Sequence, residues 1–473
     1  MNPKKWMSGV FALLLIAGMS GCGGGTTSQI MPTQSGTVFV MGTDAPLASV
    51  VSFQVDITGL TVTDLNNNSQ SVFTGTQTVD FARLNGLRTL LDINTIPPGN
   101  YTKVTVTLAN PQIGFLNVAN PPTNPPTRPT VSTLNGTTTP AATLTQSSVT
   151  IPLATPLVVS TGNTIGLKFD FNLRKSIAVD ANGQITGAVT PALDLKAITP
   201  SDADAFIDDF AAGVVNVNVS GNSFTVQGPH GHQFTVNVNG QTEWENGESI
   251  NDLTMTSIVA ISGTLDRLTG TILADSVGIL SKDRFVAGGL ITFVDPATGT
   301  ALDFDLYVRS VLPAGTGFAS GQISTINLAG NENFFIYWMH IVWGNNLANQ
   351  FFNSSLLVAG QHVSIGGPFV NGSVTVKRVV LRHEGHTGTW VVGSTDVGAH
   401  TFQFNSNGLA GVLFNGPVTV FVTPFTRFGG GLTGLGDLTG TTAIKLRVVG
   451  LILKDPINSQ PVFVARGVEK LSN

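Results

Sequence analysis

The stretch Val51-Ser52-Phe53-Gln54-Val55-Asp56-Ile57-Thr58 alternates between apolar and polar side chains. Successive side chains of a β-strand point to opposite faces, so this period of two predicts a half-buried strand. Thr102 to Leu108 repeats the alternation, and Pro97-Pro98-Gly99-Asn100 supplies a turn between the two strands. Together these elements predict an antiparallel β-sandwich, which we place over residues 36–198.

The composition of the whole chain favours strands and turns over helices. Charged residues make up 11% of the 473 residues, and there are 54 Gly and 28 Phe. A chain of this length has room for several domains, and we expect all of them to be β-structures. The formal net charge is −5 and no basic block is present. We therefore expect no nucleic-acid partner, because the electrostatic attraction to phosphates is missing.

The N-terminus has the layout of a signal peptide. Lys4 and Lys5 form a positive region, and Val10 to Met19 is an unbroken apolar run. That run is too short to cross a bilayer core of about 30 Å as a helix. We therefore predict that residues 1–21 are a cleaved signal.

The tetrapeptide Met19-Ser20-Gly21-Cys22 resembles a bacterial lipobox and contains the only cysteine of the chain. The resemblance implies cleavage before Cys22 and attachment of diacylglycerol and palmitate to this residue. Gly23, rather than Asp, follows the cysteine, which implies the outer membrane as the location. Residues 22–35 would then form a flexible tether. The alternative is an ordinary secretory signal that contains a free thiol.

Several elements of the predicted sandwich occur in an order that resembles the bacterial domain-of-unknown-function family 4382. They are Thr43-Asp44-Ala45-Pro46, Val79-Asp80-Phe81 with Leu84, Leu90-Leu91, Ile96-Pro97-Pro98-Gly99-Asn100-Tyr101, Leu167 to Phe171, and Pro191 to Leu195. The resemblance implies a prealbumin-like β-sandwich in a lipoprotein, with no assigned activity.

A proline-rich and threonine-rich segment interrupts this domain over residues 117–148. Its prolines are Pro121, Pro122, Pro125, Pro126, Pro129 and Pro140. This composition favours extended, solvated conformations, so we predict a long disordered loop. The alternative is a partner-binding loop at an exposed end of the sandwich.

An acidic stretch, residues 199–209, follows the sandwich. Its carboxylates are Asp202, Asp204, Asp208 and Asp209. We predict a solvated linker. The alternative is an interdomain calcium site between Asp202 and Asp209, because closely spaced Asp oxygens suit hard cations.

The remainder of the chain contains three copies of one pattern. In each copy a leucine precedes a glycine by ten to twelve positions: Leu253 and Gly263, Leu357 and Gly367, and Leu438 and Gly450. The copies begin near Gly213, Gly289 and Gly388. The first copy contains five predicted strands, which suggests a small closed barrel. The pattern resembles domain-of-unknown-function family 5666, which implies OB-like β-barrels. We name residues 210–282, 285–382 and 386–472 the first, second and third repeat.

The sequence contains no recognisable catalytic or metal-binding motif. The pairs His230 and His232, and His383 and His386, are predicted to be surface-loop histidines rather than metal ligands. The aromatic run Phe334 to Trp343 is predicted to be buried, and the alternative is a platform that stacks on sugar rings. We therefore predict no catalytic residue, metal or cofactor, and Cys22 is the one predicted site.

These observations favour a non-enzymatic, outer-membrane-anchored lipoprotein, held to the membrane through Cys22. Its β-domains would bind a glycan or an envelope protein, or serve in adhesion. One alternative is an enzyme acting on envelope polymers with an unrecognised active site. A second alternative is a purely architectural spacer.

Overall fold

The computed structural model describes the chain from Ser35 onward with short gaps, and residues 35–473 form one compact unit. The residues outside the description are 1–34, 46–49, 74, 85–88, 118–126, 181–183, 203–204, 229–230, 232, 267, 314–315, 337–351, 371–372, 408–413, 415, 456–457 and 472–473. The predicted signal peptide, the tether, Cys22, His230 and His232 all lie outside the described residues.

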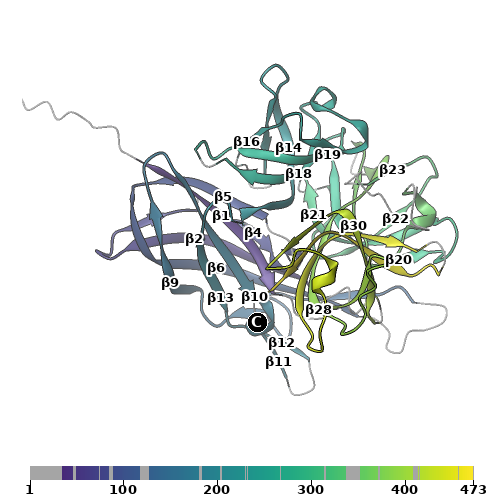
Figure 1. Cartoon of the computed structure of the whole chain (residues 1–473), viewed down its shortest axis with the longest axis horizontal. Helices are drawn as coiled ribbons and strands as arrows, with labels where there is room; N and C mark the ends of the chain where they lie inside the picture. The colour runs from purple at the N-terminus through teal and green to yellow at the C-terminus, as the bar shows by residue number, and fades with distance from the viewer. Residues whose placement is uncertain are drawn as a thin grey trace, which may run out of the picture. The chain divides into compact units, whose positions relative to one another are not determined.

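The described part of the chain consists mainly of strands, which confirms the all-β prediction (Figure 1). The sandwich region contains these elements: β1 (Gly36–Ala45), β2 (Val50–Asp64), β3 (Ser69–Ser71), β4 (Gln77–Asp80), η1 (Phe81–Leu84), β5 (Thr89–Ile96), β6 (Gly99–Asn117), β7 (Thr130–Leu134), β8 (Thr143–Leu144), β9 (Ser148–Val159), β10 (Thr164–Asn172), α1 (Leu173–Ser176), β11 (Ile177–Val179), β12 (Ile185–Val189) and β13 (Leu193–Ile198).

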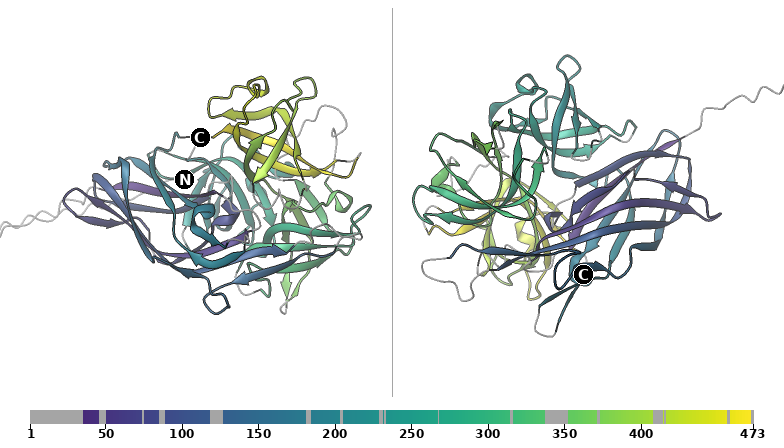
Figure 2. Two further views of the ribbon diagram at one scale, coloured as in Figure 1. Left: turned by 90° about the horizontal axis from the view of Figure 1, so that it is seen from below. Right: turned by 180° about the vertical axis from the view of Figure 1, so that it is seen from behind.

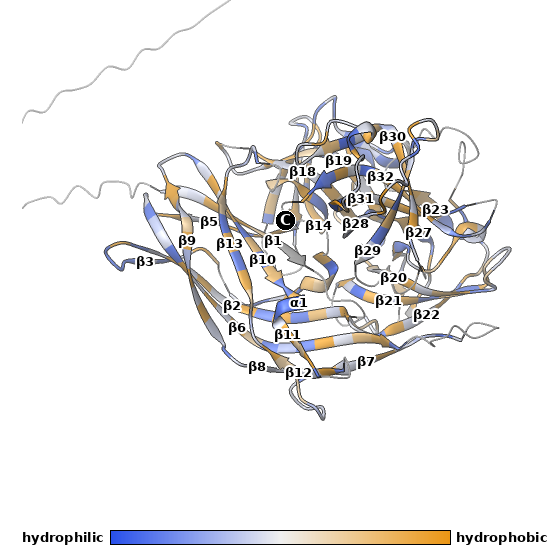
Figure 3. Ribbon diagram, turned by 60° about the horizontal axis from the view of Figure 1, so that its bottom comes forward, coloured by the Kyte–Doolittle hydropathy of each residue, from blue (hydrophilic) through white to orange (hydrophobic). Residues whose placement is uncertain are grey.

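Two sheets of this region share one core. The first sheet has the order β13-β10-β1-β5, and the second has β3-β2-β6-β7 with β4 on β2 and β9 on β6. Phe53 of β2 lies 5.0 Å from Phe171 of β10, measured between ring centroids, and Phe81 lies 5.0 Å from the same ring. The predicted alternation along β2 and β6 is visible in Figure 3. The packing supports a β-sandwich-like arrangement.

Strand β1 is buried on both faces. Val38 and Val40 belong to the sandwich core, whereas Phe39 and Met41 pack with apolar residues of the first repeat. A side chain at Gly166 would collide with the Phe39 ring, so glycine lets that ring lie against β10. The sandwich region and the first repeat are therefore joined by a continuous apolar interface.

The segment 117–148, predicted to be a disordered loop, contains ordered strands in its described part. Thr130–Leu134 forms β7, which pairs antiparallel with Ile113–Asn117 of β6. Arg128 contacts Asp303 at 2.6 Å and Asp305 at 2.7 Å in the second repeat. The prediction is corrected for these residues because threonines suit a sheet edge and a distant ion pair fixes the segment.

The strands and short helices of the repeats follow one another without long helical insertions. The first repeat contains β14 (Ile207–Asn218), β15 (Ser223–Gln227), β16 (Gln233–Asn237), β17 (Glu243–Trp244), η3 (Glu245–Gly247), η4 (Ile250–Asp252), β18 (Ile258–Leu265) and β19 (Ile272–Ser281). The second contains β20 (Val286–Asp295), β21 (Asp303–Leu312), β22 (Ile323–Asn327), β23 (Asn333–Ile336), η6 (Ser354–Leu356), β24 (His362–Gly366), β25 (Phe369–Val370), β26 (Ser373–Val374) and β27 (Arg378–Leu381). The third contains β28 (Glu384–Trp390), β29 (Thr401–Asn407), β30 (Val418–Gly429), η7 (Leu435–Asp437), β31 (Lys445–Lys454) and β32 (Pro461–Lys470).

The first and third repeats share a pairing scheme. In the third repeat the strands close a barrel in the order β28-β29-β30-β32-β31, with β30 and β32 parallel (Figure 2, yellow). In the first repeat, β16 and β19 pair in parallel and close the equivalent strand order β14-β15-β16-β19-β18. The described strands of the second repeat form the sheet β22-β21-β20-β24-β27-β23, in which β22 and β23 are the ends.

The aligned leucines and glycines of the three copies have a structural explanation. Leu253, Leu357 and Leu438 are all buried, and each directly follows a short 3-10 helix. A side chain at Gly263, Gly367 or Gly450 would collide with a backbone oxygen of the neighbouring chain segment. Two of these glycines, Gly263 and Gly450, stand at shifts of strand register. The repeated sequence pattern thus marks a close approach of two backbones that glycine permits.

Candidate functional site

A cleft of about 1060 Å³ is lined by the sandwich region together with the first and second repeats. The sandwich region contributes residues of β2, β4, η1 and β5, the first repeat contributes the start of β14, and the second repeat contributes the end of β21. Its charged lining residues are Asp80, Arg83, Arg284 and Arg309. A cavity of this size is in the range of small-ligand sites.

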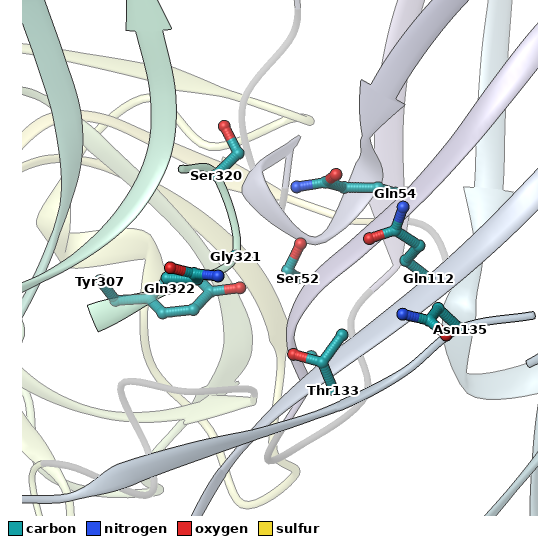
Figure 4. A pocket seen from close by; sticks show the side chains of 10 residues that line it. Ser52, Gln54, Gln112, Thr133, Asn135, Tyr307, Ser320, Gly321 and Gln322 are labelled. Atoms are coloured by element: carbon teal, nitrogen blue, oxygen red, sulfur yellow. The ribbon is translucent and has the colours of Figure 1, made fainter. Parts of the chain in front are cut away.

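A smaller recess of about 210 Å³ adjoins this cleft, because Gln54 and Ser320 line both. Figure 4 shows amide and hydroxyl side chains around it. They are Ser52, Gln54, Gln112, Thr133, Asn135, Tyr307, Ser320 and Gln322. Amides and hydroxyls offer both hydrogen-bond donors and acceptors, so the recess suits an uncharged polar ligand.

The strand pairing explains why these amide and hydroxyl side chains line the recess. Gln54 of β2 is paired in register with Gln112 of β6. Phe53 and Val55, on either side of Gln54, belong to the sandwich core, so Gln54 projects from the opposite face of the sheet. Thr133 comes from β7, within the segment predicted to be a disordered loop.

The carboxylate of Asp80 is held by hydrogen bonds from its own domain. Ser52 Oγ donates to Oδ2 at 2.9 Å, and the Phe53 backbone N–H donates to Oδ1 at 2.9 Å. Burial raises the pKa of Asp80, and the nearby Arg309 guanidinium opposes this rise. The carboxylate is therefore fixed in place without a direct ion pair to Arg83 among the described residues.

The surroundings of Arg83 in the cleft disfavour its charge. Burial lowers its pKa to about 10, and repulsion by Arg382 and Arg309 adds to the effect, while Asp209 and Asp80 oppose it. At neutral pH the guanidinium is still charged. A charged group in so unfavourable an environment is typical of functional sites.

Behind the cleft, Arg382 and Asp209 form a buried ion pair, with side chains 0% and 1% exposed. Arg382 Nε donates to Asp209 Oδ2 at 2.9 Å, and Nη1 donates to Ser364 Oγ at 2.9 Å. Asp209 has a φ of 55° and stands at a register shift of β14, a conformation that Asp tolerates better than most residues. This bulge contributes the carboxylate that neutralises Arg382.

The acidic stretch 199–209 is therefore not a solvated linker at its end, and that prediction is corrected. Strand β14 begins at Ile207, and Asp208 pairs with Arg447 of the third repeat at 2.6 Å. Ion pairs with Arg382 and Arg447, which are distant in sequence, hold Asp209 and Asp208 within the folded structure. Asp204 lies outside the described residues, and the described residues contain no group of three His, Cys, Asp or Glu arranged for a metal ion.

The histidines of His383-Glu384-Gly385-His386 are buried rather than exposed in a surface loop, which corrects the prediction. His383 is 1% exposed and His386 is 7% exposed, because β28 begins at Glu384 and continues into the third barrel. Burial lowers the pKa of His383 well below its usual range, and repulsion by Arg466 and Arg382 adds to this. His383 is therefore neutral in the folded protein.

The inward face of β28 holds a short polar chain. His386 Nε2 lies 3.1 Å from Glu384 Oε2, and His386 Nδ1 lies 3.3 Å from Ser406 Oγ. Glu384 Oε1 lies 3.9 Å from Arg309 Nη1, which connects this chain to the cleft. Sequence spacing gives no sign of this arrangement, because Ser406 comes from the next strand.

The described part of the aromatic run, Phe334 to Ile336, forms strand β23. Phe334 packs against the core of the second repeat, and Arg378 lies 3.9 Å above the ring of Phe335. Phe334, Phe335 and Ile336 are half-buried, so the described part of the run packs against the fold without being enclosed by it. Residues 337–351, including the rest of the run, lie outside the described residues.

The cleft residues are not among the predicted sites. Asp80 lies within the motif Val79-Asp80-Phe81 and Arg83 directly precedes its Leu84, so two charges within an apolar segment are the one local signal for them. Arg309 and Tyr307 lie in an ordinary strand pattern. Their role depends on a partner domain more than 200 residues earlier in the chain, which no local pattern reveals.

One family model matches the N-terminal part of the chain. Residues 35–186 match the model of a family described as "Domain of unknown function (DUF4382)". This match supports the predicted resemblance of the sandwich domain. No curated protein matches the chain. No helix in the described part of the chain is both long and apolar enough to cross a membrane.

One solved structure with some similarity is MbnP from Methylosinus trichosporium. The identity is 13%, and the alignment covers 37% of this chain and 86% of that chain, with a TM-score of 0.16. A superposition of that quality carries no argument about fold or function.

The buried ion pair behind the cleft can be tested by Asp209→Asn. Loss of the charge leaves Arg382 buried without its partner, so we expect the free energy of unfolding to fall by about 3–5 kcal/mol. Urea denaturation measures this. The matched control is Asp275→Asn, which breaks the exposed pair with Arg427 (side chains 66% exposed for Arg427 and 37% for Asp275) and should cost about 0–1 kcal/mol. If the two substitutions lower the free energy of unfolding equally, the buried pair of Arg382 and Asp209 does not have the stabilising role assigned to it.

Proposed function

We propose that this protein is a lipoprotein of the bacterial outer membrane, anchored through Cys22, whose β-domains bind a glycan. The anchor is supported by Lys4, Lys5, the apolar run and the lipobox-like Met19 to Cys22. Lipid chains contribute about 0.8 kcal/mol for each buried methylene, so two or more chains give stable attachment.

The proposal also assigns each part of the chain to a particular type of β-fold. The sandwich is prealbumin-like, and the three repeats are OB-like barrels resembling domain-of-unknown-function family 5666. The supporting observation is the strand pairing of the first and third repeats, in which a three-strand meander closes through a parallel pair with the last strand. Five-stranded barrels of this kind often bind oligosaccharides or oligonucleotides.

The observation that carries the binding function is the cleft with its adjoining amide-lined recess. Sugar hydroxyls both donate and accept hydrogen bonds, and Gln54, Gln112 and Asn135 can do the same. A purely architectural spacer does not require such a cavity. Binding is favoured over glycan hydrolysis because hydrolases of the common type use two carboxylates, and Asp80 is the one carboxylate among the described residues that line the cleft.

Glycan binding can be tested with the soluble Cys22→Ala chain on an array of envelope and extracellular glycans. We expect at least one glycan to bind, and the double substitution Gln54→Ala and Gln112→Ala to weaken its binding at least tenfold, which corresponds to about 1.4 kcal/mol. Gln233→Ala is the matched control because Gln233 is exposed on β16. The proposal would be contradicted if no glycan binds, or if the double glutamine variant binds as tightly as the Gln233→Ala control.

Membrane anchoring is tested separately by Cys22→Ala in the full chain. Without the thiol no lipid can be attached, so we expect the protein to move from the membrane pellet to the soluble fraction after a carbonate wash. Ser20→Ala, which keeps a small residue before the cleavage site, should leave it in the pellet. Retention of the Cys22→Ala chain in the membrane would refute the anchor.

A second candidate function, hydrolysis of an envelope polymer, is favoured by the chain Ser406, His386 and Glu384. The His386–Glu384 distance of 3.1 Å suits a base and its orienting carboxylate, and the Ser406–His386 distance of 3.3 Å is slightly longer than a nucleophile–base hydrogen bond. It ranks second because His386 and Glu384 are 8% and 5% exposed and His386 packs against Phe463 inside the barrel. A substrate would have limited access there.

The second candidate predicts covalent labelling of Ser406 by a fluorophosphonate probe. Ser406→Ala should abolish the label, while Ser394→Ala should not, because Ser394 Oγ donates to the Val391 backbone oxygen and lies outside the chain of three groups. Absence of any label on the folded native chain excludes this candidate.

A further inference from the structure

The cleft contains more positive than negative charge. Arg83, Arg284 and Arg309 line it, together with one carboxylate, Asp80. The whole chain is acidic, with a formal net charge of −5. Three arginines in one cleft therefore stand out against the average surface of the protein, and they create a local attraction for anions.

Two of these arginines make no hydrogen-bonded ion pair with a carboxylate among the described residues. No ion pair joins Arg83 to a carboxylate among the described residues, and its pKa falls to about 10. The side chain of Arg309 is 10% exposed, and its buried Nε has no hydrogen-bond partner within the described chain. Its nearest carboxylate, Glu384, is 3.9 Å from Nη1, beyond hydrogen-bond distance.

The contrast with Arg382 shows what these groups lack. Arg382 is fully buried and makes hydrogen bonds to both carboxylate oxygens of Asp209 and to Ser364 Oγ. Among the described residues, Arg382 thus has a hydrogen-bonded carboxylate partner, whereas Arg83 and Arg309, which line the cleft, have none. A planar guanidinium matches a carboxylate or phosphate in bidentate geometry, so an oxyanion of the ligand is the partner that the cleft lacks.

The surroundings of these arginines indicate the rest of the ligand. Gln54 and Ser320 line both the cleft and the amide-lined recess, so a molecule bound to Arg309 can extend into the recess. The cleft, at about 1060 Å³, is far larger than a free carboxylate or phosphate ion requires. An extended ligand with one charged group and several hydroxyls fits both parts.

We propose that the cleft binds an acidic saccharide, in which a carboxylate or phosphate pairs with Arg83 and Arg309 and an adjacent uncharged sugar ring occupies the recess. This inference rests on the proposed glycan-binding function and specifies its substrate class. The anion supplies the negative charge that the cleft lacks. The unfavourable environment of the Arg83 charge in the free protein is then a cost of keeping the site ready for its ligand.

The test is calorimetric titration of the soluble Cys22→Ala chain with tetragalacturonate, its methyl ester and mannose 6-phosphate. We expect tetragalacturonate or mannose 6-phosphate to bind, and the methyl ester to bind at least tenfold more weakly than tetragalacturonate. Binding should weaken as ionic strength rises. Preference for one of the two charged probes identifies carboxylate or phosphate as the group that is recognised.

Arg83→Gln and Arg309→Gln should each raise the dissociation constant of the charged probe at least tenfold. Arg83→Lys, which keeps the charge but loses the bidentate fork, should give an intermediate value. Arg427→Gln is the matched control, since Arg427 is 66% exposed and paired with Asp275. The midpoint of thermal unfolding of Arg83→Gln should be at least as high as that of the native chain, because a charge disfavoured by desolvation and by repulsion from Arg382 and Arg309 has been removed. A cooperative transition at that midpoint establishes that the variant is folded.

Several outcomes would overturn the inference. If neutral and charged saccharides bind equally well and the arginine variants bind like the native chain, glycan binding stands and the acidic class is wrong. If none of these saccharides and none on the glycan array binds, both proposals fail. If hexaglutamate binds through Arg83 and no saccharide does, the partner is an acidic peptide and the saccharide class is wrong.

Discussion

The buried ion pair between Arg382 and Asp209 is the interaction on which the arrangement of the cleft depends. The two residues are separated by 173 positions in the chain, with Asp209 in β14, directly before the first repeat, and Arg382 at the end of the second. Each charge is sheltered from water, so either one alone would be strongly unfavourable. The bulge of β14 at Asp209 and the end of β27 beside Arg382 must therefore meet for the fold to form. Phe210 and Ala211, which directly follow Asp209, line the cleft, so the pair lies at the base of the proposed site.

Apolar packing extends this constraint to the rest of the described chain. Strand β1 is buried on both faces, between the sandwich core and the first repeat. Leu451 and Val464 of the third repeat belong to the core of the second. Large apolar interfaces of this kind hold domains together more firmly than flexible linkers do. The cleft is thus built from several domains, and its charged and polar groups come from separate parts of the sequence.

The sequence allows the β-structure and the repeats to be predicted, because both depend on local patterns. The alternation along Val51 to Thr58 corresponds to β2, and the aligned leucines follow equivalent short helices in all three repeats. The errors have a different cause. The sequence predicts a solvated linker at Asp209 and a surface loop at His383, because the partners that bury these residues are distant in sequence. The same is true of Thr130–Leu134, whose ordering depends on pairing with β6.

The central claim is that the arginine-lined cleft is the site of an anionic ligand, and hydrogen–deuterium exchange tests it directly. With tetragalacturonate at saturation, the account predicts slower exchange in residues 77–84, which carry Asp80 and Arg83, and in residues 307–312, which carry Arg309. Exchange in β3, which contributes no residue to the cleft, should not change. Protection confined to segments outside the cleft, or unchanged exchange throughout a chain that binds this saccharide, would contradict the account.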